Sequence, residues 1–159
     1  MGILKLLPIE GACRCGRVGM RIEAPPLLTM ACHCTGCQRM SSSAFSLTAA
    51  VPSGAFSITR GEPAIGGLHG KEVQHFFCSY CMSWMFTKLD GPFPFVNVRP
   101  TMLDHCGWFV PFIETYTCEK LPWATTPAIH SFEKFPPFEM YESLAREYAQ
   151  SIGGLSGES

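Results

Sequence analysis

The chain has 159 residues, which is enough for one domain with a buried core and too few for two domains of ordinary size. Its 12 basic and 13 acidic side chains give a formal net charge of -1, which argues against nucleic-acid or membrane-surface binding through bulk charge. Charged residues make up 16% of the chain, but 47% are hydrophobic, so the low charge does not indicate disorder.

The first ten residues predict a short lead-in without a targeting signal. The apolar start is interrupted by Lys5, Pro8 and Glu10, which is unlike a secretory signal peptide. Leu6 stands where a myristoylation motif needs Ser or Thr. No stretch reaches the roughly 18 apolar residues that a membrane span needs. We therefore expect a cytoplasmic protein with reduced thiols and no membrane partner. The apolar excess is compatible with a homodimer.

Short strands are predicted along most of the chain. A roughly alternating pattern over residues 17–23 indicates a strand that Pro25 and Pro26 end. Residues 45–51 and 55–60 are separated by Pro52-Ser53-Gly54, which has the length of a hairpin turn. Further strands are predicted over residues 29–34, 73–78, 83–89, 95–99 and 128–134.

One helix is expected near the C-terminus. Residues 140–150 have a helical pattern, with Leu144 and Tyr148 four positions apart on one face. The Gly- and Ser-containing end, residues 151–159, is expected to be a disordered tail. The sequence thus predicts a single domain over residues 1–150.

The nine cysteines are the unusual feature, and seven of them are clustered. In a Cys-x-Cys segment on an extended strand, both side chains leave the same face. In Cys-x-x-Cys around a tight turn, two thiolates converge on one ion. Clustered cysteines in a cytosolic chain bind metal more often than they form disulfides. The clusters are Cys13 and Cys15, then Cys32, Cys34 and Cys37, then Cys78 and Cys81.

Seven clustered cysteines divide naturally into a closed four-thiolate site and a group of three with an open position. Spacing alone does not say which clusters pair, and a single structural zinc with the other thiols buried is the alternative. Cys106 and Cys118 stand apart and are expected to be buried as apolar residues, although either could complete the group of three.

A histidine, an arginine and the tryptophans are further candidates for the site. His33, between two cysteines, would point to the opposite face of a strand, so a core or surface histidine is favoured over a ligand. Arg39 could meet a substrate carboxylate, but a solvated arginine is favoured. The three tryptophans, Trp84, Trp108 and Trp123, are expected to form core and wall.

At these residues the chain resembles the glutathione-dependent formaldehyde-activating enzyme and centromere protein V family. Similar segments are Gly11–Gly16, Cys32–Arg39 and Phe77–Cys81, with Phe56–Gly61 between the last two and Lys120–Trp123 near the end. The resemblance covers roughly residues 11 to 140, in the same order. The family usually has Gly where this chain has Met82, so the turn after Cys81 is expected to differ.

The resemblance implies a mainly β fold, a β-tent of small antiparallel sheets joined by zinc. It implies two zinc ions per chain, one structural and one catalytic. The structural zinc would be bound by Cys13, Cys15, Cys78 and Cys81, and the catalytic zinc by Cys32, Cys34 and Cys37.

A zinc with three thiolates suits a soft fourth ligand such as a substrate thiol. This agrees with the activity that the resemblance implies, a zinc-dependent carbon–sulfur lyase or synthase that joins glutathione, or a similar thiol, to formaldehyde or a related electrophile. The alternative is a non-catalytic zinc-stabilised β module that binds a protein or a nucleic acid. The group of three favours the enzyme, since a binding module needs no open position, and the balanced charge disfavours nucleic acid.

Overall fold

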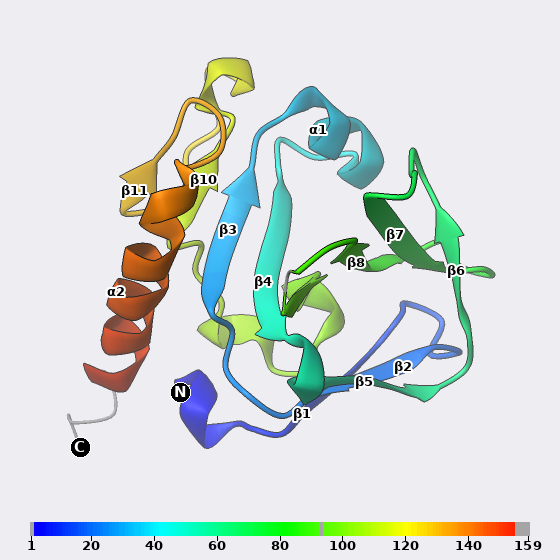
Figure 1. Ribbon diagram of the computed structural model, residues 1–159. Coiled ribbons are helices and arrows are strands. Elements are labelled where there is room, and N and C mark those ends of the chain that lie inside the picture. Colours follow the sequence, from blue (N-terminus) through cyan, green and yellow to red (C-terminus); the bar gives the residue numbers. More distant parts are fainter. Residues whose placement is uncertain (1, 93, 155–159) are drawn as a thin grey trace.

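Eleven strands and two α-helices make up the regular structure of residues 2–92 and 94–154, which the computed structural model describes (Figure 1). The strands are β1 (Ile9–Ala12), β2 (Gly19–Ile22), β3 (Leu28–Cys32), β4 (Ser46–Pro52), β5 (Phe56–Arg60), β6 (Pro63–Gly66), β7 (Val73–Cys78), β8 (Trp84–Leu89), β9 (Phe95–Val98), β10 (Ile113–Thr115) and β11 (His130–Ser131). The helices are α1 (Thr35–Ser41) and α2 (Tyr141–Gly154). The mainly β fold class and its C-terminal helix are confirmed.

The strands form two sheets that enclose the main apolar core. One sheet has the order β1-β2-β5, and the other has the order β11-β10-β3-β4-β9-β8-β7-β6. Met20 and Ile22 from the smaller sheet pack in one core cluster with Val51, Phe86 and Val98 from the larger sheet. Burial of these side chains is the main force that holds the sheets together.

The larger sheet is bigger than expected and is not wholly antiparallel. β10 pairs in parallel with both β3 and β11. A parallel pair needs a long connection, and about half of the chain, residues 33–112, lies between β3 and β10. Their pairing therefore depends on the tertiary structure and left no local signal in the sequence. β1, β6 and β10 were not predicted, and β1 begins within the lead-in expected over the first ten residues.

The predicted hairpin of residues 45–51 and 55–60 is wrong. β4 belongs to the larger sheet and β5 to the smaller one, where it pairs with β2. The chain passes from one sheet to the other through the short 3-10 segment Ser53–Ala55, near the bottom of Figure 1. A two-stranded hairpin is only marginally stable by itself, whereas here β4 pairs with β3 and β9, and β5 joins a three-stranded sheet.

α2 covers one flank of the larger sheet (Figure 1). Leu144 and Tyr148, the pair that predicted it, are 2% and 5% exposed and pack against Leu28, Phe112 and Ile113. The helix continues to Gly154, so residues 151–154 are helical rather than part of the expected tail. Residues 155–159, the rest of that tail, lie outside the described residues.

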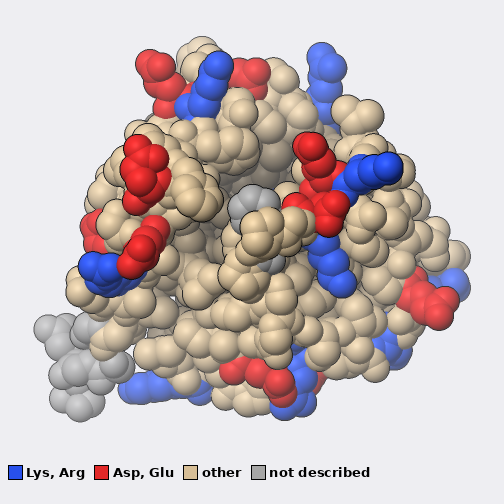
Figure 2. Space-filling view, in the orientation of Figure 1, with Lys and Arg blue, Asp and Glu red and all other residues tan. Residues whose placement is uncertain are grey.

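The remaining strand predictions agree with the structure at β2, β3, β7, β8 and β9, with small shifts of their ends. The strand expected over residues 128–134 is limited to β11. On the face shown in Figure 2, acidic and basic side chains are interspersed rather than segregated. Among the described residues, no helix is both long enough and apolar enough to cross a membrane.

Candidate metal centres

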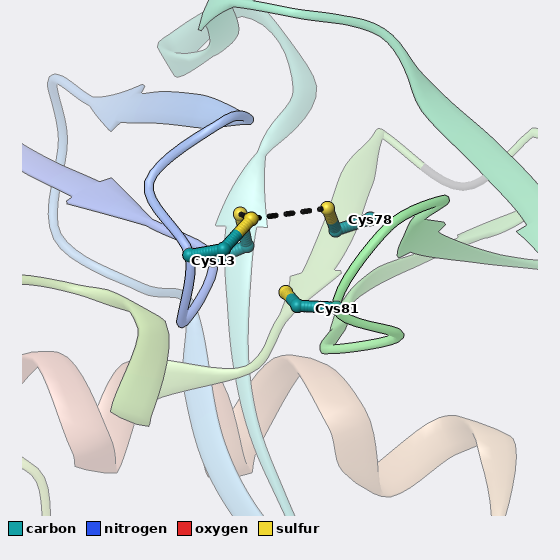
Figure 3. A group of neighbouring side chains, drawn as sticks. Cys13, Cys78 and Cys81 are labelled. Atoms are coloured by element: carbon teal, nitrogen blue, oxygen red, sulfur yellow. Dashed lines mark hydrogen bonds between the residues drawn. The ribbon is translucent and has the colours of Figure 1, made fainter.

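Four cysteines meet at the junction of the two sheets. Cys13 and Cys15 lie between β1 and β2, whereas Cys78 ends β7 and Cys81 lies in the turn before β8 (Figure 3). The Sγ atoms of Cys13 and Cys15 are 3.6 Å apart, those of Cys15 and Cys78 are 3.7 Å apart, and all four lie within 4.8 Å of one another. Sulfurs on a tetrahedral zinc are roughly 3.8 Å apart, because each Zn–S bond is about 2.3 Å. The group therefore fits one metal ion.

The segment with Cys13 and Cys15 is a turn, not the extended strand expected. Gly16 N donates a hydrogen bond to Cys13 O at 2.9 Å, and Gly16 has a φ of 79°. Val18 N donates to Cys13 Sγ at 3.3 Å. Arg14 N donates to Ser83 Oγ at 3.2 Å, which ties this turn to the one after Cys78. The turn, rather than strand alternation, brings the two sulfurs together.

The turn after Cys78 contains the residue that departs from the family pattern. Met82 adopts the left-handed conformation at a φ of 59°, and its N–H donates to Cys78 O at 2.9 Å. The turn thus accepts a methionine in a conformation that suits glycine. A hydrogen bond from Ser83 lowers the pKa of Cys81 to about 5, so this sulfur favours the thiolate form that binds metal.

The second group is the predicted triplet. Cys32 ends β3, Cys34 is the N-cap residue of α1, and Cys37 lies in its first turn. Cys37 N donates to Cys34 Sγ at 3.3 Å, and the three Sγ atoms lie within 4.8 Å of one another. A helix start, rather than the tight turn expected, therefore brings Cys34 and Cys37 together.

The triplet sulfurs are close enough to share protons. The hydrogen bond with Cys37 lowers the pKa of Cys32 to about 5, and the same bond raises the pKa of Cys37. Among the described residues, no fourth His, Cys, Asp or Glu joins this group. Three thiol donors with no fourth protein ligand fit a zinc ion with an open coordination position.

A buried ion-pair network lies beside the triplet. His33 is fully buried, as predicted for a core histidine, and its Nε2 is 2.8 Å from Glu114 Oε2. Burial opposes ionisation of Glu114, but hydrogen bonds with Ser131, His33, Thr126 and Lys120 lower its pKa to about 2. The network fixes β10 against β3 at the point where Cys32 ends that strand. Sequence reasoning missed Glu114, although it is the only Asp, Glu, Lys or Arg between Asp104 and Glu119.

The other predicted residues fall into three cases. Cys106 and Cys118 do not join the triplet, and the expectation that they are buried is wrong, because Cys106 is half-buried and Cys118 is exposed. Trp123 is 72% exposed and is not part of the core, but it lines an open groove together with Arg39. Arg39 is exposed, as favoured from the sequence.

A pocket of about 270 Å³ is lined in part by Ser46, the pairing partner of Cys32 in the neighbouring strand, and contains a residue that sequence reasoning missed. Its wall includes Trp84, as predicted, and Arg99, whose guanidinium lies 4.0 Å from the centre of the Trp84 ring. Burial lowers the pKa of Arg99 to about 10, so it stays charged at neutral pH. A single charge directly after the apolar strand β9 was the available signal.

Comparison with known proteins shows the family of this chain. The family model described as "glutathione-dependent formaldehyde-activating enzyme" matches residues 8–119, which is more than half of the chain and includes both cysteine groups. Among curated proteins, none matches the chain. A crystal structure of a Rhodobacter sphaeroides protein, a structural genomics target, has 19% identity and a TM-score of 0.49, covering 60% of this chain and 88% of that one. By the family match, the chain belongs to the glutathione-dependent formaldehyde-activating enzyme family.

Proposed function

We propose that the protein is a zinc-dependent carbon–sulfur lyase or synthase that adds glutathione to formaldehyde and reverses that addition. The family match supports the reactants, and the open three-cysteine group supports the chemistry. In the net reaction, a bond forms between the thiol sulfur and the carbonyl carbon. The C=O double bond becomes a C–OH single bond, and the thiol proton ends on that oxygen.

The observation that carries this proposal is the division of the cysteines into four and three. The four-cysteine group fits a coordinatively complete ion with a structural role. Zinc held by Cys32, Cys34 and Cys37 would accept a substrate thiol, lower its pKa and leave the sulfur nucleophilic. A three-thiolate site of this kind has no evident purpose in a β module that only binds a partner.

The chain's own residues hold the triplet in place. Gln38 Nε2 donates to His33 O at 2.7 Å and to Glu119 O at 3.0 Å, while Thr35 N donates to Glu119 Oε2 at 2.9 Å. These bonds fix the first turn of α1 against β3 and against the segment Thr117–Glu119. The spacing of the three sulfurs is therefore set before any ligand arrives, which reduces the entropy lost on binding.

The test is native mass spectrometry of zinc-replete protein with and without glutathione. We expect two zinc ions per chain and a glutathione adduct. Cys34→Ser should lose one zinc and the adduct, because the open group then has only two thiolates. Cys118→Ser is the matched control, since this exposed cysteine lies outside both groups, and it should keep both. One zinc per chain and no thiol adduct in the unaltered protein would contradict the proposal.

A further inference from the structure

Arg99 is a buried charge without a carboxylate partner. It directly follows β9 and is 8% exposed, and its backbone N–H donates to Met85 O at 2.9 Å. Within residues 2–92 and 94–154, its guanidinium forms no ion pair with a carboxylate, and its Nε has no hydrogen-bond partner. Burial lowers the pKa of Arg99, but the thiolates of Cys32 and Cys37 raise it, so its charge is not isolated. Without a carboxylate partner, however, its planar fork of donors is open to a ligand.

The guanidinium is held in a preset orientation. It stacks on Trp84, with 4.0 Å from its central carbon to the ring centre. The Trp84 ring is stacked on Phe77 at 6.3 Å between centroids, and its Nε1 donates to Thr87 Oγ1 at 3.2 Å. Because the ring is fixed, the donors of Arg99 lose little further freedom when a ligand binds.

The cavity at Arg99 provides additional donors. Its volume is about 270 Å³, and its lining combines Ser43, Ser46 and Thr101, which carry hydroxyl groups, with apolar side chains such as Phe45 and Met102. Ser46 is 2% exposed, and a hydrogen bond with its side chain opposes the rise that Cys32 causes in the pKa of Cys37, which places this hydroxyl between the cavity and the triplet. A guanidinium with hydroxyl groups around it matches the planar shape and the lone pairs of a carboxylate.

The same cavity adjoins the three-cysteine group. Ser46 is the partner of Cys32 in the pairing of β3 with β4. Ser41 Oγ donates to Cys37 O at 2.7 Å. A molecule with its sulfur or carbonyl group at the triplet can therefore extend toward Arg99.

We propose that this cavity is a carboxylate subsite, in which Arg99 binds a carboxylate of one of the two reactants. The inference rests on the proposed function, since it assumes that the reaction takes place at the triplet. Formaldehyde is neutral and little larger than water, whose share of liquid volume is about 30 Å³. It needs neither the charge nor most of the volume of this cavity, which has room and a positive charge for a second, anionic group. That group belongs either to the thiol or to a carbonyl compound larger than formaldehyde.

The test measures binding to zinc-replete protein by isothermal titration calorimetry. S-methylglutathione has the carboxylates of glutathione but no ionisable thiol, and glyoxylate is an aldehyde with a carboxylate. Mercaptoethanol is a thiol without a carboxylate. If the thiol supplies the carboxylate, Arg99→Gln should weaken S-methylglutathione binding at least tenfold, and Arg99→Lys should recover part of it. If the carbonyl compound supplies it, glyoxylate binding should show this loss instead.

The controls distinguish two roles of Arg99: binding a ligand, and balancing the negative charge of the three cysteines. Zinc content and mercaptoethanol binding should be the same in Arg99→Gln as in the unaltered protein. Arg146→Gln, which removes an exposed charge from α2, should bind every probe normally. Loss of zinc or of mercaptoethanol binding in Arg99→Gln would overturn the subsite, because Arg99 would then serve the triplet itself. Unchanged binding of both carboxylate probes in Arg99→Gln would also overturn it.

The binding experiments test the carboxylate subsite even if the proposed function is wrong. Absence of a thiol adduct at the triplet would refute the proposed function. S-methylglutathione and glyoxylate would still report on Arg99, because neither needs an ionised thiol. Loss of S-methylglutathione binding in Arg39→Gln, with none in Arg99→Gln, would place the carboxylate in the neighbouring open groove instead and would overturn the inference.

Discussion

At the scale of single residues, this chain retains a turn whose conformation favours glycine. Met82 has a φ of 59° and is 62% exposed, so its side chain gains little from burial. An L-residue in the left-handed region costs roughly 1–2 kcal/mol. The hydrogen bond from Met82 N to Cys78 O and the nearby sulfur group hold the turn in this shape. Packing around the four cysteines therefore overrides the preference of the local sequence.

We expect Met82→Gly to raise the free energy of unfolding by about 1 kcal/mol. Glycine removes the strain of the left-handed conformation, but it loses more backbone entropy on folding, which offsets part of the gain. Urea denaturation of the zinc-replete protein measures this change. Met82→Ala is the matched control, because it removes the side chain but keeps the Cβ that causes the strain. A gain of the same size in Met82→Ala would show that the side chain, and not the backbone, is responsible.

At the scale of elements, one carboxylate joins three strands that are distant in sequence. Glu114 on β10 bonds to His33, the residue after β3, and to Ser131 on β11. Lys120 Nζ lies 3.1 Å from each of its carboxylate oxygens. Both β10 and β11 are short, so their few ladder bonds alone would hold them weakly. The hydrogen bonds and ion pairs of Glu114 provide further stabilisation of these two strands and keep β10 beside the triplet.

This network makes stability depend on acid pH in a defined direction. The pKa of Glu114 falls from its ordinary value of 4.5 to about 2 in the folded chain. Its contribution is therefore fully present above about pH 5 and is lost as the pH falls through 4.5 toward 2. Glu114→Gln should lower the free energy of unfolding by about 1–3 kcal/mol at pH 7, because the donors around Glu114 lose an ionised partner. Below about pH 5, the stability of this variant should fall less steeply than that of the unaltered protein.

Urea denaturation at several pH values between 7 and 3 tests this dependence. The thiolates also take up protons in acid, but they are present in both proteins, so the difference between the two slopes reports Glu114. Glu139→Gln changes an exposed carboxylate and should keep the slope of the unaltered protein. Parallel slopes for Glu114→Gln and the unaltered protein would show that Glu114 contributes no acid dependence.

At the scale of the whole molecule, the two cysteine groups have different structural consequences. The four-cysteine group connects the loop between β1 and β2 of the smaller sheet with the end of β7 in the larger one. The triplet lies within six consecutive residues at one end of the larger sheet. Metal in the first group would tie the sheets together, whereas metal in the second would hold a segment that α1 and β3 already support.

We therefore expect Cys78→Ser to unfold the chain or make it insoluble, and Cys34→Ser to remain folded with one zinc fewer. A structural zinc supplies about 10–16 kcal/mol in small zinc-finger peptides, which is comparable with the whole stability of a domain. Circular dichroism and zinc content of the purified variants measure both outcomes. Full metal content in both variants would contradict the division into four and three.

The sequence by itself determined the mainly β class, the helix at Leu144 and Tyr148 and the three cysteine clusters, because strand patterns, helical spacing and short cysteine motifs are local signals. Spacing could not decide which clusters meet; only the resemblance to a family suggested the pairing that the structure shows. The tertiary structure alone placed β4 and β5 in different sheets and brought β10, with Glu114, beside His33. It also placed Arg99 in the cavity beside the triplet. These contacts join residues far apart in the chain, and their free energy comes from burial and pairing that no short segment encodes.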